Sequence, residues 1–100
     1  MMEQYRSFWI CGGAEGQKDS LLGLVSRWYP NGSIDYVRRA GSMVELTRFQ
    51  LRSMTFDEKG IAELFGLEIA RLLVDSCYRD MAIARYETGK RLLEQHRFRH

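Results

Sequence analysis

Few residues of this chain have the types and spacing of a catalytic or metal-binding site. Its two histidines, His96 and His100, lie four residues apart, a spacing that would place both on one helical face as metal ligands. They stand in a polar, basic tail that offers no cluster of further ligands, so we expect exposed histidines and no metal site. No cofactor is predicted either.

The two cysteines are the other candidates for reactive side chains. Cys11 and Cys77 each lie in an apolar context, whereas a secreted, disulfide-stapled domain would carry more cysteines. We therefore expect two buried free thiols in a cytoplasmic protein. Charges interrupt the N-terminus, so no signal peptide is expected, and no apolar stretch is long enough to span a membrane. A small enzyme that uses Cys11 or an acidic pair is the weaker alternative.

A glycine-rich segment and several acidic residues complete the catalytic search. Residues 12–16 read Gly-Gly-Ala-Glu-Gly but lack both the Gly-Lys-Ser/Thr ending of a phosphate loop and the glycine spacing of a dinucleotide site. The acidic residues of the C-terminal half are spread around a helix and do not converge. We predict that the protein is not an enzyme.

Arginine gives this chain a candidate binding surface. Arginine dominates its basic residues, which suits surfaces that contact a partner, although a GC-rich genome would produce the same bias. The net charge is only +2. Arginines alternate with apolar residues in one expected strand and recur in the tail over residues 90–100. The predicted partner-binding residues are Tyr36, Arg38, Arg39, Arg48, Gln50, Arg52, Arg91, Arg97 and Arg99.

The first half of the chain predicts strands and one short helix. Tyr5 to Cys11 is a strand that ends at Gly12-Gly13, and Asp19-Ser20 caps a helix that reaches Trp28. Pro30-Asn31-Gly32 ends that helix in a turn. Most aromatic residues should fill the core, Trp9 and Trp28 among them.

A hairpin follows over residues 34–54. Ile34 to Arg39 and Met43 to Met54 are its strands, joined through Ala40-Gly41-Ser42. Strict alternation in the second strand predicts one buried and one solvated face. Val44 and Leu46 fall out of phase with this alternation, so we expect a bulge near Leu46-Thr47.

A long helix begins near Asp57. One side carries large apolar residues that we expect to pack on the sheet, and small residues on another side would let an element approach closely. Because a helix of this length would exceed a compact domain, we expect a break at Arg79-Asp80 or at Thr88-Gly89-Lys90. The expected apolar side comprises Ile61, Leu64, Phe65, Ile69, Leu72, Leu73, Cys77 and Met81, the solvated side Glu68, Arg71, Asp75 and Arg79, and the small residues are Ala62, Gly66 and Ala70.

These elements predict an α+β fold in one domain over residues 1–100, with a basic tail at 90–100 that frays. A small antiparallel sheet of three or four strands packs against the amphipathic C-terminal helix. Residues 81–87 are helix or a fourth strand, and we favour helix. As a strand they would give a ferredoxin-like order that resembles RNA-recognition domains and implies RNA binding on the sheet, but their glycine-aromatic signature is missing.

The function that these features favour is binding of another protein. Small phage-encoded inhibitors, anti-CRISPR proteins among them, share this size and lack of catalytic groups, so we expect occlusion of a surface on a larger protein or nucleoprotein complex. The alternative is nucleic-acid binding through the arginine-rich hairpin. A partly apolar second side of the helix (Leu67, Val74, Ile83) also predicts a homodimer, and no membrane partner is expected.

Overall fold

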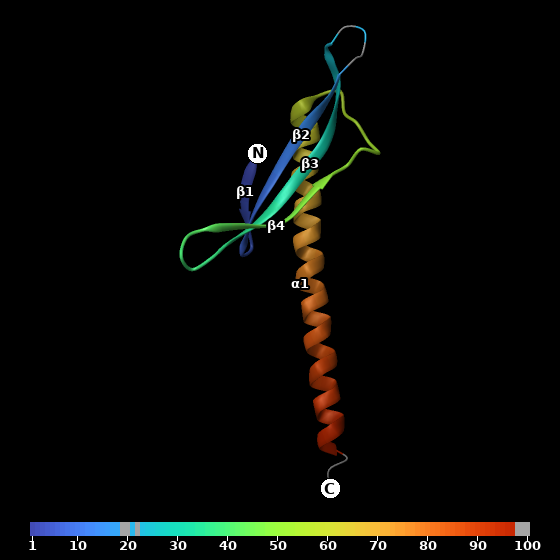
Figure 1. Ribbon diagram of the computed structural model, residues 1–100. Helices are drawn as coiled ribbons and strands as arrows, with labels where there is room; N and C mark the ends of the chain where they lie inside the picture. The colour runs from blue at the N-terminus through green and yellow to red at the C-terminus, as the bar shows by residue number, and fades with distance from the viewer. Residues whose placement is uncertain (19–20, 22, 98–100) are drawn as a thin grey trace.

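The computed structural model describes residues 1–18, 21 and 23–97 and has an α+β fold. Four strands, β1 (Met2–Tyr5), β2 (Phe8–Lys18), β3 (Val25–Val37) and β4 (Met43–Gln50), form an antiparallel sheet in chain order, and one helix, α1 (Lys59–Arg97), follows. The helix packs against one face of the sheet (Figure 1). The predicted fold class is confirmed.

The N-terminal segment forms two strands where the sequence predicts one. β1 and β2 turn at Arg6, whose φ of 54° is in the left-handed region. β2 then continues through the glycines to Lys18, so the predictions of a strand end at Gly12-Gly13 and of a loop over 12–16 are wrong. Pairing to β3, which sets Gly12 opposite Gly32, holds these glycines in the sheet.

The predicted turn at Pro30-Asn31-Gly32 is also wrong, because these residues lie in the middle of β3. The carbonyl of Pro30 accepts a hydrogen bond from the amide of Leu51 at 2.9 Å. In a strand the nitrogen of a residue points to the same side as its carbonyl. The nitrogen of Pro30, which carries no hydrogen, therefore faces Leu51, just beyond the end of β4. No hydrogen bond within β4 itself is lost.

The predicted short helix before Pro30 is replaced by strand. Val25 to Trp28 belongs to β3, and the amide and carbonyl of Trp28 pair with Phe56 at 2.8 and 2.9 Å. The expected cap, Asp19-Ser20, lies outside the described residues. Partners from distant parts of the chain thus decide the conformation of a segment whose spacing favours a helix.

The β3–β4 hairpin confirms two predictions. Its turn lies at residues 38–42, where Gly41 has a φ of 85° and Arg38 donates to the carbonyl of Ser42 at 2.9 Å. The register shifts between Ile34↔Thr47 and Asp35↔Glu45, which leaves Leu46 as the bulged residue. Because of this bulge, Glu45 and Arg48 lie on the same face of the sheet.

α1 is continuous over 39 residues, and the predicted breaks are wrong. Residues 81–87 are helix, as favoured, so the ferredoxin-like alternative is also wrong. The prediction of a break assumed a compact domain, but the helix extends far beyond the sheet, in a molecule with extents of 78 × 33 × 17 Å (Figure 1). Every residue from Arg79 to Gln95 is exposed.

The side of α1 that packs on the sheet is not the predicted one. The small residues Ala62 and Ala70 are fully buried there, beside Leu67 and Val74. Gly66 lies against the backbone of Asn31, too close for a larger residue. The residues of the expected apolar side are instead exposed or partly exposed: Ile61, Leu64, Leu72, Leu73, Cys77 and Met81 are exposed, and Phe65 and Ile69 are half-buried.

Candidate protein-binding surfaces

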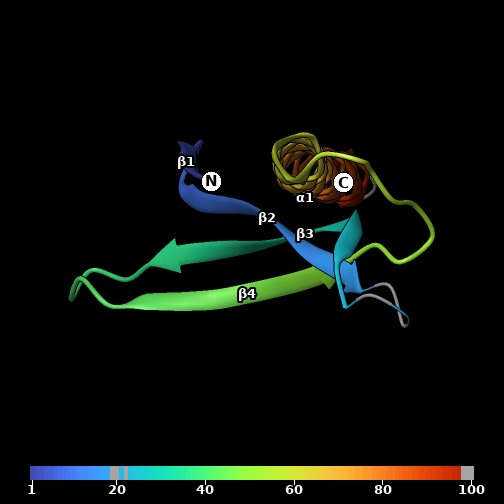
Figure 2. The same ribbon diagram turned by 90° about the horizontal axis from the view of Figure 1, so that it is seen from above.

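The face of the sheet turned away from α1 is open. Side chains alternate between the two faces of a strand, so Ile10 and Gly12 of β2 face the helix while Trp9 and Cys11 face away. Seen from above, α1 lies on one side of the sheet only (Figure 2). We call the opposite side the open face.

Cross-strand pairing arranges the open face in rows. Cys11 lies opposite Ser33, which lies opposite Arg48, and the next row is Gly13, Asn31 and Gln50. Gly13 has no side chain, and the side-chain oxygen of Asn31 lies where its β-carbon would stand. The face is hollowed beside these rows. The hollow has a volume of about 530 Å³ and is lined by Cys11, Ala14, Glu15, Asn31, Gly32, Ser33, Arg48, Phe49 and Gln50.

Ion pairs, and not free cations, characterise this face. Arg48 donates to Glu45 at 2.7 Å, and this hydrogen bond lowers the pKa of Glu45 and raises that of Arg48. Arg52 lies 3.5 Å from Glu15 and 5.8 Å from the ring centre of Tyr29. Arg48 and Arg52, the arginines of the hairpin that lie at the open face, are therefore matched by carboxylates on the same surface.

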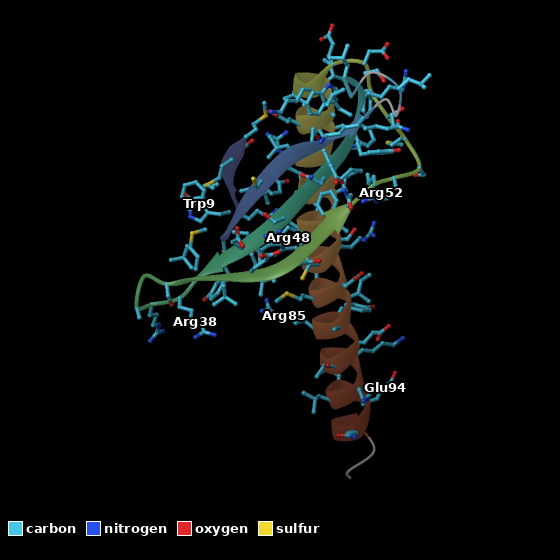
Figure 3. All side chains as sticks on the ribbon, turned by 45° about the horizontal axis from the view of Figure 1, so that its top comes forward. Trp9, Arg38, Arg48, Arg52, Arg85 and Glu94 are labelled. Atoms are coloured by element: carbon cyan, nitrogen blue, oxygen red, sulfur yellow. The ribbon has the colours of Figure 1, made fainter. Side chains whose placement is uncertain are left out.

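The structure separates the predicted partner-binding residues into several places. Arg48, Gln50 and Arg52 lie together at the open face, as predicted. Tyr36 lies on the helix side, where its ring is 6.2 Å from that of Phe8. Figure 3 shows Arg38 far from Arg52, near the end of the hairpin. The remaining members are Arg39 in the hairpin turn, Arg91 and Arg97 on the distal part of α1, and Arg99, which lies outside the described residues.

Sequence reasoning missed the contribution of β2 and β3 to the open face. Trp9 was expected in the core but is half-buried on the side away from the helix, and Asn31 was expected in a turn. A two-residue period that begins at Phe8 would have found this arrangement, since Phe8, Ile10 and Gly12 alternate with Trp9, Cys11 and Gly13. Glycines weaken that signal because they show no preference for either face.

Hydrogen bonds and ion pairs attach the first half of α1 to β1. Asp75 accepts from the Tyr5 hydroxyl at 2.7 Å and from Arg6 at 3.0 Å. Arg71 pairs with Glu3, and this hydrogen bond raises the pKa of Arg71. The predicted solvated side is therefore only partly correct: β1 half-buries Arg71 and Asp75, whereas Glu68 and Arg79 are exposed.

A small apolar groove lies between α1 and the β3–β4 hairpin. It has a volume of about 270 Å³. Cys77 borders it and is exposed, so the prediction that this thiol is buried is wrong, and Cys11 is only half-buried. Both thiols are free, as predicted. The groove is lined by Phe8, Ile34, Leu46, Thr47, Leu73, Val74 and Cys77.

The solvent side of α1 is a second large surface. Several large apolar side chains are prominent on it, and Tyr86 is 71% and Leu93 is 69% exposed. Large apolar side chains gathered on an exposed surface are typical of contact with another chain.

Within residues 1–18, 21 and 23–97, no cluster of three or more potential metal ligands is found. None of the helices in the same residues is long and apolar enough to cross a membrane. Comparison with protein-family models, with curated proteins and with solved structures finds no match to this chain. The surfaces of the molecule are therefore the basis for a functional proposal.

Proposed function

We propose that this chain is a non-enzymatic protein-binding module that occupies a surface of a larger protein through the open face of its sheet. The observation that carries this proposal is the uncovered hollow of about 530 Å³, with hydrogen-bonding groups of Asn31, Ser33, Arg48 and Gln50 along its walls. A sheet face that neither a helix nor a second sheet covers is free to receive a partner.

The charges of the open face favour a protein over a nucleic acid. Register and contacts assign Glu15, Asp35 and Glu45 to this face together with Arg48 and Arg52. A phosphate backbone needs uncompensated cations, and here the arginines already have carboxylate partners. A protein surface offers groups of both charges and can match such a pattern.

The mode of action that fits is occlusion. α1 packs directly on β2 and β3, and Asp75 and Arg71 bond it to β1, so we expect this backing to make the open face a firm surface. A firm surface loses little entropy on binding, which suits an inhibitor that acts only by covering its target. An anti-CRISPR-like inhibitor is one example of this class.

A comparative pull-down from source-organism lysate tests the proposal. We expect the chain to retain a discrete protein after nuclease treatment, and the double variant Arg48→Glu, Arg52→Glu to lose it. The matched control, Arg85→Glu with Arg91→Glu, makes the same charge change on exposed helix beyond the sheet and should retain the protein.

Two results would contradict the proposal. Recovery that disappears with nuclease, together with binding of plain oligonucleotides that weakens steeply with salt, would establish the nucleic-acid alternative. Undiminished capture by the Arg48, Arg52 variant, with its circular dichroism unchanged, would remove the open face as the binding surface.

A further inference from the structure

Within the part of the chain that the structure describes, the distal half of α1 has no packing contact with the sheet that would stabilise it as a helix. Isolated helices of this length are marginal in water, and most helical stability in proteins comes from packing of an apolar side. Yet every residue from Arg79 to Gln95 is exposed, and the sheet ends beside the first half of the helix (Figure 1). A second chain along this segment would supply the missing packing.

One stripe of α1 has the spacing of a helix–helix contact. Nine positions follow one another at alternating intervals of four and three residues. The first two, Phe65 and Ile69, border the sheet-packed Ala62 and Gly66 and are half-buried, and the Phe65 ring lies 5.2 Å from that of Phe56. From Leu72 onwards the stripe lies on the side of α1 that is turned away from the sheet. Six of the nine are large and apolar, including Leu72 at 60% and Ile83 at 50% exposure. We call this stripe the seam: Phe65, Ile69, Leu72, Ser76, Arg79, Ile83, Tyr86, Lys90 and Leu93.

The polar members of the seam decide the direction in which two copies would pair. In a parallel pair, equivalent positions face each other, so Arg79 would meet Arg79 and Lys90 would meet Lys90 of the second copy. Like charges at facing positions are destabilising. A parallel arrangement is therefore disfavoured at two of the nine positions.

An antiparallel pair removes both conflicts. With Ser76 set opposite Arg79 of the second copy, the small serine leaves room for the arginine to reach Asp75 or Asp80 beside it. The same register sets Leu72 opposite Ile83. It also sets Ile69 opposite Tyr86 and Phe65 opposite Lys90, whose ammonium then lies near Glu68 of the other copy.

Charge along the helix agrees with this direction. On either side of the helix midpoint, residues 59–77 contain three acidic and two basic residues, whereas residues 78–97 contain three acidic and five basic ones. Antiparallel pairing sets the acidic half of each helix beside the basic half of the other. The register also centres the two-fold axis between Cys77 and Tyr78, near the middle of Lys59–Arg97, so the two helices overlap along their full length.

We propose that α1 pairs antiparallel with α1 of a second copy of this chain through the seam. Each sheet-supported half then covers the distal half of the other helix. The sheets lie on the outer sides of the helix pair, so both open faces remain accessible. Pairing of α1 does not depend on what binds the open face, so the dimer proposal and the open-face proposal can each fail without the other.

Mass and label distance test the arrangement directly. Light scattering at about 100 µM should give twice the chain mass of 11.7 kDa. A spin label at Gln95→Cys, in a Cys11→Ser, Cys77→Ser background, should show an intermolecular separation of about 50 Å, from 1.5 Å of rise per residue on either side of the axis. A parallel dimer would instead bring the labels close together, on helices about 10 Å apart.

Two substitutions beyond the sheet identify the contact surface. Ile83→Glu lies in the seam and should raise the dissociation constant of the dimer at least tenfold. Met81→Glu changes a side chain of similar exposure, 46% against 50%, on the sheet-facing side and should leave the dimer intact. A monomeric parent chain, a short label distance, or equal effects of the two substitutions would each overturn the proposal.

Discussion

Gly66 of α1 lies so close to the backbone carbonyl of Asn31 in β3 that an added side chain would collide with it. On the sheet, Gly12 has the same role, because an added β-carbon there would lie 2.6 Å from the amide nitrogen of Leu67. Glycine on both sides lets the helix and sheet backbones approach closely. This contact selects the side of α1 that enters the core.

The first prediction concerns Gly66. Gly66→Ala should lower the free energy of unfolding by about 1–3 kcal/mol, because overpacking against a backbone atom exceeds the roughly 1 kcal/mol that alanine adds to helix propensity. Gly89→Ala is the control, since no atom lies within 4 Å of its added β-carbon, and it should stabilise the helix. Urea unfolding of both variants measures the difference, and a stabilised Gly66→Ala variant would contradict the close contact.

The second prediction concerns the bond between Tyr5 and Asp75. Tyr5→Phe removes a part-buried hydrogen bond of 2.7 Å to a carboxylate and should cost about 1–2 kcal/mol of stability. Tyr78→Phe removes an exposed 3.1 Å bond to Ser7 and should cost less. Chemical denaturation compares the two, and an equal or reversed order would show that the Tyr5 contact does not hold β1 to the helix.

The third prediction concerns the pH dependence of the Glu45–Arg48 pair. The hydrogen bond from Arg48 lowers the pKa of Glu45 from its ordinary value of 4.5. The pair therefore stabilises the folded chain above pH 4.5, and this contribution is lost as the pH falls through the lowered pKa. Carboxylate NMR should find the Glu45 midpoint below 4.5, and in Arg48→Gln it should return upwards. An unchanged midpoint would mean that the pair does not form in solution.

The fourth prediction concerns the two thiols. Cys77 is exposed and Cys11 is half-buried on the open face, so iodoacetamide should modify Cys77 faster at neutral pH. Mass spectrometry of the Cys11→Ser and Cys77→Ser variants separates the two rates. Faster modification of Cys11 would indicate an activated thiol in the hollow and would favour the enzyme alternative.

The sequence predicted elements correctly where short-range chemistry specifies them. The hairpin turn at Gly41 needs a left-handed residue, and the out-of-phase Leu46 requires a bulge. The predictions were wrong at Pro30 and over residues 25–28, where partners distant in sequence decide the structure. Trp28 is strand because Phe56 pairs with it, and no local pattern reports that partner.

The open face likewise has one part that the sequence predicted and one part that depends on the tertiary structure. Alternation in the hairpin predicted that Arg48, Gln50 and Arg52 share one face, and they do. Their carboxylate partners could not be predicted as a set, because Glu15 comes from β2 and Glu45 reaches the face only through the bulge. The expected basic surface is consequently a surface of mixed charge.

The sequence by itself determined that this chain has a small sheet and a long helix, because side-chain spacing indicates which segments alternate with a period of two and which repeat every three to four residues. For residues 81–87 it only favoured helix over strand. Only the tertiary structure decided which apolar face is internal. Close approach of Gly12 and Gly66 admits the small side of α1 to the core and leaves larger residues such as Leu72 in solvent. Periodicity measures how apolar a face is, whereas burial also depends on how near the neighbouring backbone lies.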